Sequence, residues 1–340
     1  MEFMITLRNA DGSDGVGPVR YLTFTGEMGT DNDLALNDWR ARVIATFPAG
    51  DRNPAGHPDR TGDILFLVHG FNESHESAKA LHLKCVKALA DEGWFGRVIS
   101  YDWPSDGLVF AYLPDRVNAR AAASALVSGA IAVLEGAQQT QCTINVHVLA
   151  HSMGGFVVQQ AFTWSYQDVP ADWRIGQLMF AAADVDYTVF EVDTPSTKAF
   201  ASHAGRLTAY SNRYDKALLV SNAKRLELAP RMGRVGLPDT APPMMCEVNC
   251  SALFEKVFPG IQNDLSPSVT HSFYFDRPEF WRDVVLNLGG GIDRGVFPTR
   301  EPDPSSSSAN RFELDPAGID DATYWAALAR AATSPSIRVP

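Results

Sequence analysis

The sequence predicts an α/β protein with a mostly parallel central sheet and helices on both faces of that sheet. First, residues 63–69 are apolar on both faces of a strand, as a buried parallel strand requires. Second, strands of this kind alternate with helical patterns of ten or more residues, as in 77–92. Third, the strand at 143–150 runs into a small-x-Ser-x-Gly turn and then into an apolar helix at 155–166.

The other elements follow from periodicity and turn residues. The expected strands, in chain order, are 4–7, 20–25, 63–69, 96–100, 143–150, 177–182, 206–210 and 244–248. The expected helices are 39–46, 77–92, 116–139, 155–166, 217–224, 278–288 and 322–332. Residues 230–243 and 266–272 read as loops because they are rich in proline and polar residues.

The domain organisation follows from where these elements stop. An Asp- and Gly-rich turn joins the first two strands, so residues 1–26 should form an N-terminal hairpin. Residues 298–310 are rich in Pro, Ser and charge, which is typical of a flexible linker. We therefore predict one domain over 1–297 with its core at 63–288, followed by a linker and a short C-terminal helix over 298–340.

The amino-acid composition limits the classes of binding partner and the cellular location that we expect for this protein. The chain of 340 residues is 45% hydrophobic and 20% charged, which suffices for a sizeable core. Its net charge of −11 argues against nucleic acid or an anionic membrane as a partner. No apolar run is long enough for a membrane span, and the first residues do not resemble a secretory signal. We expect a cytoplasmic protein without stable membrane association, either a monomer or a homodimer.

The chain has four cysteines, too few to staple it with disulfides. Cys246 and Cys250 lie four residues apart, a spacing that fits a disulfide, half a metal site or two inert thiols. No second Cys/His pair has zinc-finger spacing, which favours inert thiols. We expect no metal and no cofactor.

The turn at residues 150–154 carries the chemistry. A serine on a sharp strand-to-helix turn projects its hydroxyl from the end of the sheet, and its neighbours must be small. Ala150 and Gly154 occupy those neighbouring positions around Ser152, with alanine where the usual pattern has its first glycine. The helix begins directly after the serine, so the Met153 N–H is available as one donor of an oxyanion hole.

Six motifs in a fixed order extend this pattern over roughly residues 63–288. They are HGFN at 69–72, YDWPSDG at 101–107, AHSMGG at 150–155, AADVD at 182–186, a Tyr-to-Leu stretch at 210–218 and HSFY at 271–274. This order resembles the alpha/beta-hydrolase superfamily, and more narrowly a poorly characterised bacterial group of esterase/lipase-like serine hydrolases. The last motif departs mildly from the group, with Phe273 where tyrosine is usual.

The resemblance implies a catalytic triad in the chain order Ser, Asp, His. Ser152 would be the nucleophile, and His271 would take its proton and pass it to the leaving group. Asp215, after the second strand beyond the turn, is the favoured acid, and Asp184, after the first, is the alternative. Among the other histidines, we expect His147 to be structural, His151 to point away from the reaction, His69 to shape the oxyanion loop, and His57, His75, His82 and His203 to lie in polar loops or on a helix.

The remaining site residues follow from the same resemblance. The second oxyanion N–H is assigned to Phe71, with the side chain of Asn72 as a supporting group. The acyl pocket is expected around Trp103, Phe110, Tyr112 and the connection at 185–204. In that connection, Phe190 and Phe200 could form a small lid, and Phe190 is our second substrate-binding residue after Trp103.

These features predict a metal-independent hydrolase of short- to medium-chain carboxylic esters, with a small-molecule ester as its substrate. The same triad also serves amidases, thioesterases and lactonases, because the motif does not specify the leaving group. A non-catalytic scaffold that binds a ligand or protein is the alternative from another class, and it predicts a broken triad.

Overall fold

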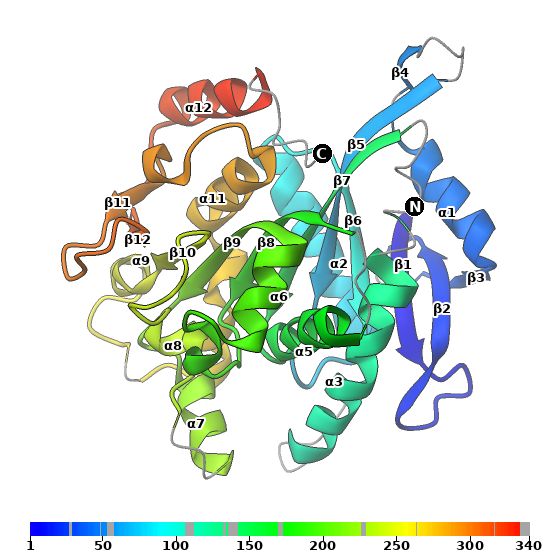
Figure 1. The fold of residues 1–340 in the computed structure, drawn as a ribbon, viewed down its shortest axis with the longest axis horizontal. Helices are drawn as coiled ribbons and strands as arrows, with labels where there is room; N and C mark the ends of the chain where they lie inside the picture. The colour runs from blue at the N-terminus through cyan, green and yellow to red at the C-terminus, as the bar shows by residue number, and fades with distance from the viewer. Residues whose placement is uncertain are drawn as a thin grey trace. The chain divides into compact units, whose positions relative to one another are not determined.

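The computed structural model describes residues 1–26, 29–47, 49–52, 58–105, 112–131, 134, 142–168, 173–225, 229–262, 264–315 and 317–333. The chain divides into two compact units. The first consists of Met1–Lys87 and Phe95–Ile175, and the second of Ala88–Trp94 and Gly176–Pro340. Both have the α/β character that the sequence predicts (Figure 1).

The sheet of the first unit has the strand order β7-β5-β6-β1-β2-β3, with β4 paired to β5. Its strands are β1 (Glu2–Arg8), β2 (Val16–Phe24), β3 (Asn32–Leu34), β4 (Ala49–Arg52), β5 (Pro58–Val68), β6 (Arg97–Asp102) and β7 (Cys142–His151). β5 pairs in parallel with both β6 and β7, and β1 pairs in parallel with β6. β1 and β2 are antiparallel, so the hairpin continues the parallel sheet on the β6 side (Figure 1).

The helices of this unit connect the parallel strands. They are α1 (Leu36–Ala45), α2 (His75–Asp91), α3 (Tyr112–Leu126), the π-helical turn η1 (Val127–Ile131) and α5 (Met153–Asp168). The last turn of α2 is counted with the second unit. The core strand residues Ile64 to Val68 are almost fully buried, which accounts for their continuous apolar run.

The second unit repeats the pattern. Its strands are β8 (Ile175–Ala181), β9 (Ala204–Ser211), β10 (Met245–Asn249), β11 (Arg300–Pro302) and β12 (Arg311–Leu314), in the order β11-β12-β10-β9-β8. β10 is parallel to both β9 and β12, whereas β11 is antiparallel to β12. Its helical segments are η2 (Tyr187–Phe190), α6 (Pro195–His203), α7 (Lys216–Arg225), α8 (Met232–Val235), α9 (Ser251–Val257), α10 (Pro267–Ser272), η3 (Phe273–Asp276), α11 (Pro278–Gly289), η4 (Arg294–Val296) and α12 (Asp321–Thr333).

The prediction of a loop at 266–272 is wrong, because residues 267–272 form helix α10. Ser266 caps this helix by accepting the Val269 N–H at 3.3 Å, and Pro267 occupies its first turn. Proline fits the first turn because the N–H it lacks has no partner inside the helix there. The short helix α8 likewise interrupts the loop predicted at 230–243.

The linker predicted at 298–310 also differs from the structure. Residues 300–302 form β11, and β12 then joins the sheet beside β10. Arg300 is buried, and Asp283 accepts two hydrogen bonds from it at 2.7 Å each. The charge-rich composition misleads because Asp283, which lies in another helix, neutralises the buried Arg300.

None of the helices in the described part of the chain has the length and apolar character that crossing a bilayer requires.

Candidate active site

The strand register of the first unit brings several polar residues to one edge of the sheet. Val68 of β5 lies opposite both Ala150 of β7 and Tyr101 of β6. Thr6 of β1 lies opposite Asp102 of β6. The residues at or just after these strand ends, including His69, Asp102 and Ser152, therefore lie at the carboxyl edge, where open α/β sheets bind ligands.

Ser152 lies between β7 and α5 in the left-handed region, with φ of 54°. This conformation is costly for a residue with a side chain and is concentrated at functional sites. A Cβ on Gly154 would lie 2.4 Å from the Val68 carbonyl oxygen and 2.5 Å from that of His69. Only glycine fits there, which explains the small residue that follows the serine in the motif.

The loop after β5 lies directly against this turn. A Cβ on Gly70 would lie 2.7 Å from the Ser152 Cβ and 3.3 Å from its Oγ. Asn72 is in the left-handed region with φ of 59°, and its side chain is exposed. Phe71 lies between these two residues. As the first residue of α5, Met153 has an N–H that belongs to the helix end without intrahelical partners.

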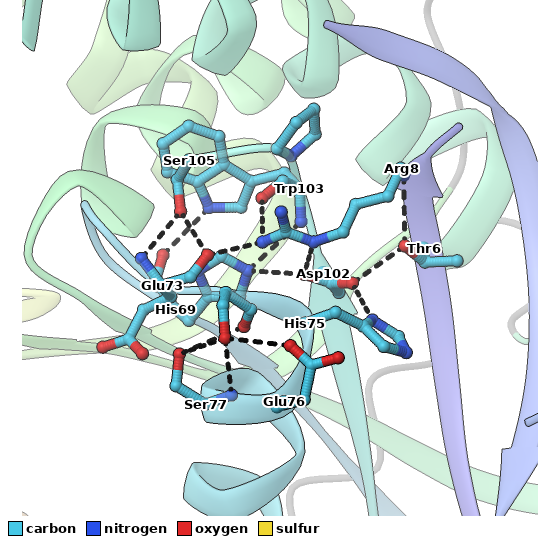
Figure 2. A network of polar contacts seen from close by, with 12 residues as sticks. Thr6, Arg8, His69, Glu73, His75, Glu76, Ser77, Asp102, Trp103 and Ser105 are labelled. Atoms are coloured by element: carbon cyan, nitrogen blue, oxygen red, sulfur yellow. Dashed lines mark hydrogen bonds and ion pairs between the residues drawn. The ribbon is translucent and has the colours of Figure 1, made fainter. Parts of the chain in front are cut away.

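His69 anchors the start of this loop (Figure 2). Its Nδ1 is 3.0 Å from the Gly70 carbonyl oxygen, and its Nε2 is 3.1 Å from Asp102 Oδ1. The Trp103 indole stacks on the imidazole at 5.6 Å with an interplanar angle of 6°, and its N–H donates to the His69 carbonyl at 3.0 Å. These contacts support the expectation that His69 shapes the loop.

Asp102 is fully buried, and four side chains contact its carboxylate (Figure 2). Thr6 Oγ1 and Arg8 Nε lie at 2.9 and 2.8 Å, and the rings of His69 and His75 at 3.1 and 2.7 Å. Burial alone would raise the pKa of Asp102, but hydrogen bonds from the two histidines and the charge of Arg8 hold it well below its usual range. Asp102 is therefore an anion with a full set of partners.

Sequence reasoning missed this cluster. His75, expected in a polar loop or on a helix without a motif, begins α2 and also contacts Asp31 at 2.6 Å. Burial would lower the pKa of His75, but its hydrogen bonds to Asp102 and Asp31 and their charges raise it. The sequence did contain a signal for this cluster, the YDWPSDG motif. The motif placed Asp102 at the end of a strand, but sequence reasoning assigned no role to this residue.

In the second unit, Asp215 follows β9 and is fully buried. Its Oδ1 accepts the Leu218 N–H at 2.9 Å, which caps α7, and its Oδ2 lies 2.6 Å from His271 Nδ1. With Nδ1 donating to the carboxylate, a neutral His271 ring carries its lone pair on Nε2, the nitrogen that accepts a proton.

The charges around His271 stabilise its protonated form. Burial would lower the pKa of this histidine, but the charge of Asp215, the hydrogen bond to it and the charge of Asp184 raise it above the ordinary value of 6.5. A general base with a raised pKa is a stronger proton acceptor once it is neutral.

Asp184 is buried in the second unit with other partners. Ser221 Oγ lies 3.0 Å from both of its carboxylate oxygens, and Arg231 Nε lies 3.4 Å from Oδ1. The buried Arg231 also forms an ion pair with Asp186. Asp184 thus belongs to an ion-pair cluster whose charge reaches His271.

The residues expected around the acyl pocket are placed as follows. Trp103 is fully buried on His69, so its contact with substrate stays a prediction. Phe190 and Phe200 are fully buried and stack at 5.8 Å, each also contacting Phe180, so both belong to the core of the second unit and not to an exposed flap. Phe110 lies outside the described residues, and Tyr112 is the first residue of α3.

Two of the remaining histidines lie on helices, as expected, His82 on α2 and His203 on α6. His82 and His203 are buried, the former with Ser100 and Glu2 as partners. His147 is buried in β7, and His57 lies outside the described residues. A Cβ on Gly70 would lie 3.3 Å from His151 Nδ1, so this ring lies close to the loop after β5.

Cys246 and Cys250 are buried free thiols, so they do not form the disulfide that their spacing allows. Burial raises the pKa of both, most strongly that of Cys250, which makes them unreactive. Among the residues that the structure describes, no group of three or more His, Cys, Asp or Glu side chains is arranged to hold a metal ion.

Comparison with known families gives one finding. A family described as an alpha/beta hydrolase of unknown function (DUF900) matches residues 56–280. The match spans the region in which the six ordered motifs lie, and it confirms the resemblance and the fold class. No curated protein is similar enough to the chain to count as a match.

Proposed function

Because the chain belongs to this alpha/beta-hydrolase family, we propose that it is a serine hydrolase that cleaves carboxylic esters with short- to medium-chain acyl groups. The observation that carries the proposal is the backbone of Ser152, held at a φ of 54° between a buried strand and the first residue of a helix. A turn of this kind costs about 1–3 kcal/mol, and it presents a hydroxyl at a helix N-terminus.

In the proposed reaction, Ser152 attacks the ester carbonyl as His271 takes its proton. The C–O bond to the leaving alcohol breaks, and His271 returns the proton to that alcohol. Water then hydrolyses the acyl-enzyme by the same route. The contact of 2.6 Å between His271 and Asp215 supports their assignment as base and acid.

The N–H groups of Phe71 and Met153 are proposed to stabilise the oxyanion. Support comes from the loop of Phe71, which packs against Ser152 at Gly70, and from Met153 at the start of α5. Loss of one such donor costs ~3 kcal/mol in other hydrolases. Trp103 and Phe190 remain proposed substrate-side residues.

The test is hydrolysis of p-nitrophenyl esters across acyl lengths by the wild type, Ser152→Ala, His271→Ala and Asp215→Ala, each checked for folding. Ser124→Ala, an exposed serine on α3, is the matched control. We expect the control to match the wild type and Ser152→Ala to lose about 10⁴-fold or more in kcat. Fluorophosphonate labelling should map to Ser152 and should persist with EDTA.

Other outcomes select other functions. An active Asp215→Ala moves the acid to Asp184. Labelling of Ser152 without ester turnover directs the assays to amides, thioesters and lactones. If the wild type neither turns over esters nor reacts with the probe, the serine is not activated, and a non-catalytic binding scaffold replaces the proposal.

A further inference from the structure

The loop at residues 69–73 is held at both ends by groups from β1, from β6 and from the residues that directly follow β6. At its start, His69 contacts Asp102 and Trp103, as described above. At its end, the Glu73 N–H donates to Ser105 Oγ at 3.2 Å, and the Glu73 carbonyl accepts Arg8 Nη2 at 2.6 Å (Figure 2). Between these anchors lie Gly70, which touches Ser152, and Phe71.

Arg8 connects the two anchors through one side chain. Its Nε donates to Asp102 Oδ1 at 2.8 Å, and its Nη2 reaches the carbonyls of Glu73 and Trp103 at 2.6 and 3.3 Å. A guanidinium can make such divergent contacts because it is planar and carries several fixed donors, whereas a lysine ammonium cannot hold the same set. Arg8 ends β1, which lies before the segment that the family match covers.

We propose that Arg8 is a positioning residue that, with Asp102, holds the loop at 69–73 against Ser152 and thereby fixes the Phe71 N–H. The inference rests on the proposed function for its catalytic meaning. The hairpin at the start of the chain is then part of the machinery that places the oxyanion hole, although it touches no reacting atom.

The surroundings of Arg8 provide a way to test this. Its side chain is 13% exposed and lines a cavity of about 670 Å³ together with Thr6, Arg20, Ser74 and His75. Removal of the Arg8 side chain leaves a space that a guanidinium ion can enter from this cavity. Arg20 lines the same cavity but forms an ion pair with the exposed Asp33, so it is a matched control.

The experiment compares the wild type, Arg8→Ala, Arg8→Lys and Arg20→Ala. Misplacement of a catalytic group by about 1 Å can cost about 100-fold in rate, so we expect Arg8→Ala to lose about 10- to 100-fold in kcat with little change in KM. Arg8→Lys should lie between it and the wild type. Guanidinium, well below denaturing concentrations, should restore part of the activity of Arg8→Ala only. Arg20→Ala should keep the wild-type kcat.

Hydrogen exchange of the peptide that contains residues 69–73 gives a readout that needs no activity. It should accelerate in Arg8→Ala and not in Arg20→Ala. Wild-type kcat and wild-type exchange in Arg8→Ala would overturn the proposal. The proposal is also overturned if the loss of kcat in Arg8→Ala is fully explained by a smaller folded fraction. It is overturned as well if guanidinium increases the activity of Arg20→Ala as much as that of Arg8→Ala.

Failure of the proposed function is recognised separately. A wild type that neither turns over esters nor labels with fluorophosphonate removes the esterase assignment. In that case exchange alone decides whether Arg8 holds the loop: faster exchange in Arg8→Ala supports the positioning, and unchanged exchange refutes it.

Discussion

Asp215 and Asp184 are two buried carboxylates whose charges both act on His271, yet different partners hold them. Asp215 contacts His271 Nδ1 and accepts the Leu218 N–H in the first turn of α7. Asp184 is engaged by Ser221 and Arg231. At the residue scale, this difference supports the proposed roles, in which Asp215 orients His271 and Asp184 acts on it through its charge.

The pH profile tests this division of roles. Only neutral His271 accepts a proton, so activity is lost as the pH falls through its pKa, and the acid limb of kcat/KM should lie above pH 6.5. Asp184→Asn removes a charge that raises this pKa, so the limb should move to lower pH while the plateau activity persists. Asp215→Asn should instead lose about 10⁴-fold in kcat at every pH. An Asp184→Asn variant as inactive as Asp215→Asn would contradict the assignment.

At the scale of elements, the turn from β7 into α5 requires a close approach between its own backbone and the backbone at the end of β5. Gly154 lies against the carbonyls at the end of β5, and Gly70 lies against Ser152. The contact at Gly154 cannot relax by rotation of a side chain, since both opposing atoms are backbone oxygens. The turn and the loop after β5 are therefore fitted to each other as one unit of structure.

Gly154→Ala should disturb this fit. Its Cβ would meet two carbonyl oxygens at 2.4 and 2.5 Å, so we expect a loss of about 1–3 kcal/mol of stability from overpacking. Fluorophosphonate labelling should slow more than this loss of folded protein explains, because Ser152 shifts with the turn. Thermal unfolding and labelling rates, measured on the same samples, check both effects. Unchanged labelling in a fully folded variant would mean that the turn tolerates the shift.

At the scale of the whole molecule, the C-terminal segment is built into the second unit. Asp283 of α11 accepts from Arg300, from Thr299 and from Tyr210 of β9, all buried. The Arg300 guanidinium also lies over the rings of Phe297 and Phe312, at 4.5 and 5.8 Å. A buried cation with this set of partners fixes where the chain returns to the sheet.

Arg300→Met should therefore destabilise the protein by about 3–5 kcal/mol, because it leaves the Asp283 charge buried without its cation. Adding Asp283→Leu should recover much of that loss, since the unpaired charge is then removed. Arg213→Met, at a largely exposed ion pair with Glu255, is the control and should cost less than about 1 kcal/mol. Urea unfolding measures all of these. A small effect of Arg300→Met would show that this ion pair contributes little to stability.

Local chemistry in the sequence determined the α/β class, the buried strands, the elbow serine and the candidates Asp215 and His271. Such features follow from hydrophobic periodicity and from turns that need small residues, and both are written in neighbouring positions. Only the tertiary structure decided which carboxylate contacts His271, that residues 298–314 return to the sheet, and that Arg8, His75 and Asp102 form one cluster. Arg8 and Asp102 are 94 residues apart, and their contact depends on which strands pair and in which register. No local pattern carries that information, because it arises from the packing of the whole sheet.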